Sequence, residues 1–253
     1  MHYRILIHFI KVLTKLSVFA FLHCCFNFAF AQNLIINPGF EGNESGKPSM
    51  RPWQTINTID YFIYKESKTE QKIRIRPARF LGMSLFNRSI VYIYDLRPAR
   101  SGVAYTGMRM WIGHSEYLVA ELSEPLERDK NYLFEMYILS SPNTNSYIME
   151  LGVSAYPDIP PYNQKDAVLA YPPQVRIFKP DGFSETKEWT IIRGVFTAEG
   201  GEKHLIIGNF VLNEKERFRR KKSGLKQKEA YYFIDDVGLF KLDEKGWPMR
   251  GDE

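Results

Sequence analysis

Residues 132–139 read Tyr-Leu-Phe-Glu-Met-Tyr-Ile-Leu, and this stretch indicates the fold of the chain more clearly than any other. Tyr132, Phe134, Met136 and Ile138 occupy alternate positions, and successive side chains of a β-strand point to opposite faces of the sheet. We therefore expect these four side chains to be buried together on one face. The period of two predicts a strand, because an amphipathic helix would repeat its apolar residues every three or four positions.

Short apolar and aromatic runs of the same kind recur on both sides of this stretch, each bounded by turn residues. They lie at Val103–Ile112, Tyr117–Leu122, Tyr147–Ala155, Trp189–Ala198, His204–Leu212 and Tyr231–Leu242. No segment sustains the pattern of an amphipathic helix. Many short strands separated by Gly, Pro and Asn turns predict an all-β sandwich or barrel.

Two stretches interrupt this rhythm. Lys65–Arg100 is mixed in character, although the apolar run Ser89–Tyr94 within it is compatible with an extra strand. Tyr156–Pro173 is rich in Pro, Tyr, Asp and Gln and has no periodicity. Connections of this length in a compact domain are usually functional or mobile.

The first 31 residues have the composition of a secretory signal peptide, with basic residues spread through an apolar run and no acidic residue. Ala29-Phe30-Ala31 supplies the small-x-small cleavage pattern just before Gln32. We expect one mature domain over residues 32–242 and a tail over residues 243–253, because no Pro-, Ser- or Gly-rich linker divides the chain. An uncleaved membrane anchor and a lipoprotein attached through Cys24 are the alternatives.

Removal of the signal peptide changes the composition of the protein. Both cysteines and three of the five histidines leave with it, so His114 and His204 are the histidines of the mature chain. The 34 basic residues become 31 against 29 acidic ones, which lowers the formal charge from +5 to +2. An exported domain without disulfides must be held by its core, by a metal, or by both. The small charge gives no indication of a nucleic-acid partner.

Two motifs at opposite ends of the mature chain resemble a known family. Residues 33–41 read Asn-Leu-Ile-Ile-Asn-Pro-Gly-Phe-Glu, which is similar to the opening of carbohydrate-binding modules of families 4, 9 and 22. Residues 232–239 read Tyr-Phe-Ile-Asp-Asp-Val-Gly-Leu, which resembles the closing strand of the same group. The chain is most similar to the jelly-roll module at the N-terminus of many exported Bacteroidetes proteins, where an OmpA-like domain often follows. Further agreement comes from Ala104-Tyr105-Thr106-Gly107, Glu116-Tyr117-Leu118, Leu122, Pro125-Leu126, Trp189, Ala198 and Ile207-Gly208-Asn209-Phe210.

This resemblance implies an antiparallel jelly-roll β-sandwich of the galactose-binding-like type, over about residues 33–242. Only eleven residues follow Leu242, so we expect no OmpA-like domain. In such modules the first and last strands meet and commonly hold a structural calcium ion, and the matching carboxylates here are Glu41 and Asp235. Calcium prefers six to eight oxygen ligands, which suits a carboxylate pair with nearby carbonyls. The alternative is that both side chains bind turn amides or pair with Lys or Arg; Asp236 would point to the other face of a regular strand.

Sugar binding requires exposed aromatic rings and a few polar groups that orient the hydroxyls. The tyrosines of the long irregular stretch, Tyr156, Tyr162 and Tyr171, are the candidate ligand-binding residues. The other interpretation is that they cover the rim of the core. The mature chain also retains Trp53, Trp111, Trp189 and Trp247, of which we expect Trp111 and Trp189 to belong to the core.

The sequence favours a protein without catalytic activity. It contains no Gly-x-Ser-x-Gly, His-Glu-x-x-His or Gly-rich phosphate loop. A hydrolase would require an inward-facing carboxylate pair in a cleft, and the acidic residues on the strands are typical of a solvated face: Glu116, Glu121, Glu135, Glu150 and Asp158. The basic run Lys215–Lys228 is either a solvated connection between the last strands or a contact for acidic glycans or lipid head groups.

We therefore expect an exported, non-catalytic binding module that recognises a glycan or cell-surface polysaccharide and holds structural calcium. The alternative is a structural or assembly protein of the cell envelope that lacks sugar binding and has an envelope protein as its partner. Either would act in the periplasm, on the outer-membrane surface or outside the cell. A fold by itself does not choose between these functions.

Overall fold

The structure is a computed structural model, and it describes residues 31–44, 47–57, 59–64, 97–111, 113–161, 168–220 and 229–249. The chain divides into two compact units, residues 33–248 and a smaller unit of residues 1–32 with 249–253. The strands that the structure describes lie in the larger unit. The predicted signal peptide (up to residue 30), the possible strand at Ser89–Tyr94 and Tyr162 fall outside the described residues.

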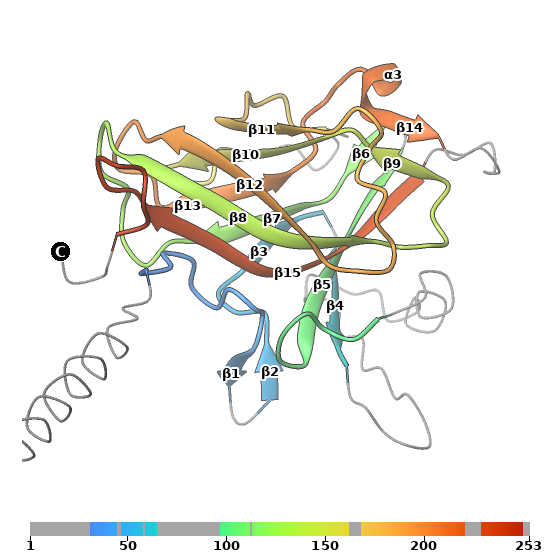
Figure 1. Cartoon of the computed structure of the whole chain (residues 1–253), viewed down its shortest axis with the longest axis horizontal. Coiled ribbons are helices and arrows are strands. Elements are labelled where there is room, and N and C mark those ends of the chain that lie inside the picture. Colours follow the sequence, from blue (N-terminus) through green and yellow to red (C-terminus); the bar gives the residue numbers. More distant parts are fainter. Residues whose placement is uncertain are drawn as a thin grey trace, which may run out of the picture. The chain divides into compact units, whose positions relative to one another are not determined.

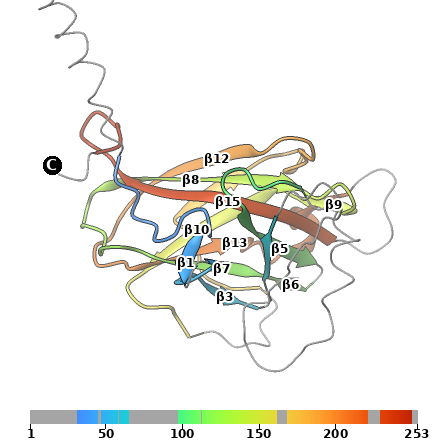
Figure 2. The same ribbon diagram turned by 90° about the horizontal axis from the view of Figure 1, so that it is seen from below.

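Two antiparallel sheets form the layers of a sandwich (Figure 1, Figure 2). One sheet has the order β12 (Thr190–Thr197), β8 (Asn131–Ser140), β15 (Glu229–Lys241), β5 (Ala104–Trp111) and β4 (Asp60–Ile63), with β6 (His114–Ser115) also pairing with β5. The other has the order β11 (Val175–Phe178), β10 (Glu150–Tyr156), β13 (His204–Gly208), β7 (Tyr117–Glu121) and β3 (Gln54–Ile56). These sheets confirm the predicted all-β, antiparallel β-sandwich.

Two small ribbons and one helical turn complete the described elements. The ribbons are β1 (Gly42–Glu44) with β2 (Lys47–Ser49), and β9 (Ser146–Ile148) with β14 (Phe218–Arg220). The helical turn is α3 (Glu214–Arg217). In the part of the chain that the structure describes, no helix is both long and apolar enough to cross a membrane.

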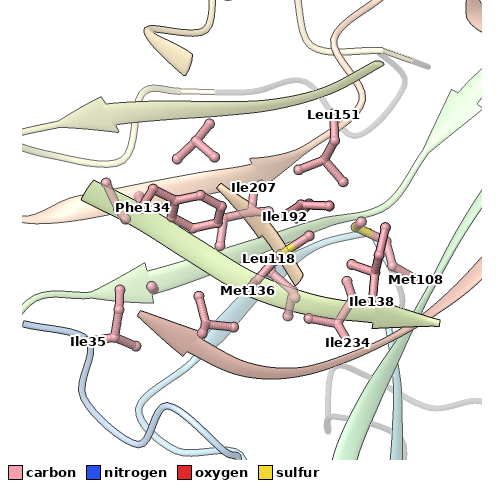
Figure 3. Close-up of a cluster of buried hydrophobic side chains, with 14 of the residues drawn as sticks. Ile35, Met108, Leu118, Phe134, Met136, Ile138, Leu151, Ile192, Ile207 and Ile234 are labelled. Atoms are coloured by element: carbon pink, nitrogen blue, oxygen red, sulfur yellow. The ribbon is translucent and has the colours of Figure 1, made fainter. Parts of the chain in front are cut away.

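The main core lies between the two sheets, and β8 is central to it. Tyr132, Phe134, Met136 and Ile138 are at most 3% exposed and join one cluster with residues of the opposite sheet, such as Leu118 (Figure 3). The predicted shared face of this strand is therefore confirmed. Burial of an aliphatic or phenylalanine side chain contributes about 1.5–3 kcal/mol relative to exposure, so this face is a large part of the stability.

Each sheet also carries a second apolar cluster on its outer face. On β5, Met108 lies in the main core, whereas Tyr105 belongs to a separate cluster. On β13, Ile207 lies in the main core, whereas Ile206 belongs to a third cluster. Residues an odd number of positions apart along a strand point to opposite faces of the sheet. Both outer faces are therefore partly covered, which limits the surface that remains for a ligand.

The other predicted strands occur with shifted ends. The run Tyr147–Ala155 is two strands, β9 and β10, because residue 149 lies between them and Ile148 pairs with Phe218 rather than with the five-stranded sheet. The run His204–Leu212 ends as a strand at Gly208. The connection from there to β15 contains α3 and β14, so it is not a simple hairpin.

Candidate functional site

The opening motif forms a loop that Asn37 organises. Its side-chain amide donates to the carbonyls of Ser49 (2.8 Å) and Arg51 (2.9 Å), and its oxygen accepts from the amide of Gly42 (2.7 Å). The indole of Trp53 donates to the Asn37 carbonyl (2.8 Å). The half-buried Asn37 side chain thus satisfies backbone groups of the loop that would otherwise need other partners.

This loop lies beside the end of β15, as expected from the resemblance. The amide of Leu34 donates to the Leu239 carbonyl (2.8 Å), and the amide of Val237 donates to the Pro38 carbonyl (3.0 Å). A Cβ on Gly39 would lie 3.8 Å from both Glu41 Cγ and Asp235 Oδ1. The two carboxylates predicted to bind a metal therefore lie close to the same glycine.

Both carboxylates accept hydrogen bonds from one segment, residues 100–104. Oε1 of Glu41 accepts from the amides of Val103 (2.6 Å) and Ala104 (2.5 Å), and Oδ2 of Asp235 accepts from the amide of Arg100 (2.8 Å). Asp235 is fully buried. Burial, and next the negative charge of Asp236, raise the pKa of Asp235 to about 7.

The expectation that Asp236 points away does not hold. It depended on regular strand geometry, but β15 shifts register between Asp235 and Gly238, and Asp236 has a left-handed backbone with φ of 47°. The Asp236 carboxylate accepts from Arg100 Nη1 (2.5 Å) and Ser101 Oγ (2.7 Å). A β-bulge re-aims side chains in this way, so both aspartates face the 100–101 segment.

Tyr156 and Tyr171 lie together on the outer face of the five-stranded sheet. Their rings are 5.9 Å apart at 67°, and the Tyr171 hydroxyl donates to the Pro161 carbonyl (2.6 Å). Both are half-buried and pack against the outer cluster that contains Ile206. The structure thus brings these two predicted ligand-binding residues together, and they also cover the sheet.

An open depression of about 470 Å³ lies on the same outer face, at the edge formed by β10 and β11. Glu150 is paired with Phe178, and Gly152 with Arg176, while Leu151 and Val153 point into the main core. Directly opposite residues share a face. The volume lies within the roughly 300–1,000 Å³ range of ligand sites. The lining residues are Met149, Glu150, Arg176, Phe178, Val211 and Glu216.

The lining of the depression combines an aromatic ring with an ion pair between the exposed Arg176 and the buried Glu150. The Phe178 side chain is 61% exposed. Arg176 donates from Nε to Glu150 Oε1 (3.0 Å) and from Nη2 to Oε2 (2.7 Å), the bidentate geometry that gives arginine–carboxylate pairs their directionality. These hydrogen bonds raise the pKa of Arg176. The depression therefore presents an apolar ring beside polar groups in fixed positions.

Buried hydrogen bonds hold the wall of the depression. Asn209 is fully buried; its side chain donates to the Glu150 carbonyl (2.6 Å) and accepts from the Val211 amide (3.2 Å). The Met149 amide donates to the Arg217 carbonyl (3.1 Å), and the Arg217 guanidinium donates to the His114 carbonyl (2.9 Å) and to Ser115. Arg217 is 1% exposed, so the prediction of a uniformly solvated basic run is wrong at this residue.

The structure contains an inward-facing carboxylate pair elsewhere. Glu116 is 7% exposed and accepts from the Arg109 amide (2.7 Å), and Asp60 accepts from the Tyr231 hydroxyl (2.7 Å). Burial, and then the charge of Asp60, raise the pKa of Glu116 well above its usual value. The Glu116 carboxylate thus provides an acceptor for a β5 amide that lies between the residues paired with β4 and those paired with β6. Neither carboxylate lines the depression.

Sequence reasoning missed Arg176 and Phe178 and placed Glu150 on a solvated face. The available signal was the alternation of Val175 and Ile177 with Arg176 and Phe178, which marks a short strand at the end of the irregular stretch. Four residues are too short a run to distinguish a strand from a loop.

The described residues form an all-β sandwich with an open, ligand-sized depression at the edge of β10 and β11. The sequence matches no protein-family model, and no curated protein matches it. Solved structures similar to this one include carbohydrate-binding modules. The family 61 module TmCBM61 in complex with β-1,4-galactotriose has 15% identity, covers 83% of this chain and 99% of its own, and has a TM-score of 0.36. The CBM22-1 xylan-binding domain of Xyn10C from Paenibacillus barcinonensis has 9% identity, 83% and 95% coverage, and a TM-score of 0.40.

An adhesin domain is also similar. The K3 cleaved adhesin domain of Lys-gingipain from Porphyromonas gingivalis has 11% identity, covers 56% of this chain and 74% of its own, and has a TM-score of 0.32. These likenesses concern the all-β architecture. The ligands named for those proteins are properties of those proteins.

Proposed function

We propose that this chain is an exported, non-catalytic module that binds a glycan through the depression between β10, β11 and the 211–217 segment. The observation that carries the proposal is the exposed Phe178 ring beside the Glu150–Arg176 ion pair. The apolar face of a pyranose stacks on an aromatic ring, while its hydroxyls require donors and acceptors in fixed positions. The predicted signal peptide would carry the module to the periplasm, the outer-membrane surface or the medium.

The rigidity of the site supports binding without a large ordering cost. The bidentate pair holds Arg176, and Asn209 ties the wall to Glu150. A ligand that meets preformed groups loses less conformational entropy on binding. Two glutamates line the depression: both oxygens of Glu150 accept from Arg176, and Glu216 accepts from the Asn213 side chain. Tyr156 and Tyr171 lie on the same sheet face and are proposed as a secondary contact.

The proposal is tested by binding measurements on the protein and two variants. We expect saturable binding to one member of a glycan panel that includes β-1,4-galactotriose and xylohexaose, the ligands of two compared carbohydrate-binding structures. Phe178→Ala should weaken it about tenfold or more, since loss of an aromatic contact costs more than about 1.4 kcal/mol. Val195→Ala, which removes another exposed apolar side chain on β12, should leave binding unchanged.

The alternative, an envelope structural or assembly protein with a protein partner, predicts a different result. The absence of measurable binding to every glycan of the panel would favour this alternative. Binding that is equally strong in Phe178→Ala would remove the depression as the site. Release of shorter oligosaccharides during incubation would show hydrolysis and contradict the non-catalytic assignment.

We further propose that Glu41 and Asp235 hold a structural calcium ion. Support comes from Asp235, a fully buried carboxylate beside a second aspartate, which a cation would stabilise. The described residues contain no group of three or more His, Cys, Asp or Glu side chains placed to hold a metal. Backbone carbonyls would therefore supply the remaining ligands. When bound, the ion would join the first and last segments of the sandwich.

Calcium binding to the folded state alone adds about 2.7 kcal/mol when calcium is at one hundred times its dissociation constant. The protein should therefore melt several degrees higher in millimolar calcium than in EDTA. Asp235→Ala should abolish this difference, whereas Asp158→Ala, at an exposed carboxylate far from Asp235 in the sequence, should retain it. Equal melting temperatures in the two buffers, with no metal by elemental analysis, would leave both carboxylates as acceptors of turn amides.

A further inference from the structure

The turn that follows β15 presents an exposed tryptophan on a well-tied backbone. Trp247 is 70% exposed, whereas Trp53 is buried and Trp111 and Trp189 are half-buried. An indole is the largest apolar side chain and normally covers other apolar surface. A tryptophan left in solvent on an ordered segment therefore requires a reason.

Four hydrogen bonds and one β-bridge hold this turn. The carboxylate of Asp243 accepts from the amides of Lys245 (2.9 Å) and Trp247 (2.8 Å). The Asp243 amide donates to the Trp247 carbonyl (2.8 Å), the Gly246 amide donates to the Asp243 carbonyl (3.0 Å), and Leu242 bridges to Pro248. Gly246 has a φ of 82°, which is unfavourable for a residue with a side chain. The backbone thus fixes Trp247 at the surface, and that preorganisation favours binding.

The surroundings of the ring indicate the chemistry of its ligand. Residues 241–250 carry three basic and two acidic residues, a formal charge of +1, and so lack the cluster of Lys and Arg that attracts an anionic lipid surface. Nearby, Lys241 pairs with Glu127 at 2.6 Å. One aromatic ring among charged residues is far below the roughly 1,000 Å² that a stable protein interface needs. A single uncharged sugar ring matches both the size and the polarity.

The turn is remote from the depression. Tyr232, near the start of β15, accepts from the amide of Ile148, next to the depression, whereas Lys241 at the other end of β15 precedes the turn. The nine residue steps between them span roughly 30 Å at the rise of a β-strand. Figure 1 shows β9 and β14 at one end of the sandwich and the turn after β15 at the other.

We propose that Trp247 is a second carbohydrate-contact site, which stacks on an uncharged sugar ring at the opposite end of the module from the depression. It extends the proposed glycan-binding function but does not depend on Phe178. Two separated contacts would let one module engage two chains or two stretches of one polysaccharide, which raises avidity without any new contact within either site.

The test follows the indole N–H signal of Trp247 by NMR, assigned by its loss in Trp247→Phe. The probes are xylohexaose, cellohexaose, mannohexaose, chitohexaose and β-1,4-galactotriose. We expect a saturable shift of this signal with at least one probe, in the wild type and in Phe178→Ala alike. Trp247→Ala should weaken retention on the matching insoluble polysaccharide about tenfold or more, and the surface control Val195→Ala should not.

Three outcomes would overturn the second site. The Trp247 signal could be unmoved by every probe, it could shift only with phosphatidylcholine or phosphatidylglycerol vesicles, or it could shift only with protein concentration. Glycan binding that needs Phe178 but never moves Trp247 would remove the second site alone. A shift of Trp247 with binding unaffected by Phe178→Ala would instead remove the depression alone.

Discussion

The Tyr117 hydroxyl on β7 connects the irregular stretch after β10, at Leu169, to the five-stranded sheet by a hydrogen bond. Tyr117 is 1% exposed on the outer face of β7. Its hydroxyl accepts from the amide of Leu169 (2.9 Å) and donates to the carbonyl of Asn209 (2.9 Å). The substitution Tyr117→Phe keeps the ring and removes both hydrogen bonds, so it isolates their contribution.

The expected cost follows from the two groups left behind. Leu169 is 3% exposed, so its amide would be buried without this partner, at about 1–3 kcal/mol. The Asn209 carbonyl also accepts from Ser115 at 3.4 Å, so its loss is that of an ordinary hydrogen bond, about 0.5–1.5 kcal/mol. The sum is about 1.5–4.5 kcal/mol, or a melting temperature lower by about 3–18 °C at the usual 2–4 °C per kcal/mol for this size.

Chemical denaturation and calorimetry measure this change, and Tyr232→Phe is the matched control. Tyr232 is equally buried, and its hydroxyl accepts one hydrogen bond, from the amide of Ile148 (3.0 Å). Its loss should cost about 1–3 kcal/mol. Amide exchange at Leu169 should accelerate in Tyr117→Phe and not in the control. A loss below about 0.5 kcal/mol for Tyr117→Phe would refute the assignment of this hydroxyl as the connection.

Two further predictions concern pH and the basic run. Because burial raises the folded-state pKa of Glu116, this group should make the wild type lose stability as pH rises from about 4.5 through that pKa, by up to about 1.4 kcal/mol per pH unit. In pH-dependent melts Glu116→Gln should remove this part of the slope and leave the part contributed by Asp235, whereas the exposed-site variant Glu121→Gln should keep the whole slope. Changing the exposed Lys215 and Arg220 to Gln should alter stability by no more than about 0.5 kcal/mol. Arg217→Met should cost about 2 kcal/mol or more, because it removes the donor to the His114 carbonyl and the Ser115 hydroxyl. Equal melting temperatures for the two variants would contradict this distinction.

The strands could be predicted from sequence because their signal is local. The alternation at residues 132–139 requires only that one face of a sheet be apolar, and the structure buries that face. The meeting of the two motifs, at residues 33–41 and 232–239, was expected from the resemblance, and the hydrogen bond from the Leu34 amide to the Leu239 carbonyl bears it out. Glu41 and Asp235 both accept hydrogen bonds from residues 100–104, while their role as metal ligands stays a prediction.

The depression depended on tertiary structure. Its lining comes from three separate parts of the chain, and Glu150 and Phe178 share a face only through the register of β10 and β11. The direction of Asp236 was decided by a β-bulge, and a bulge shifts register without any compositional mark at a single residue. Arg217 is part of a basic run in the sequence, yet it is buried, and the groups that accept its hydrogen bonds, the His114 carbonyl and the Ser115 hydroxyl of β6, lie more than one hundred residues earlier. Sequence periodicity reports which face of an element is apolar, whereas the position of a polar site is set by which elements pack side by side, and that is determined by the whole fold.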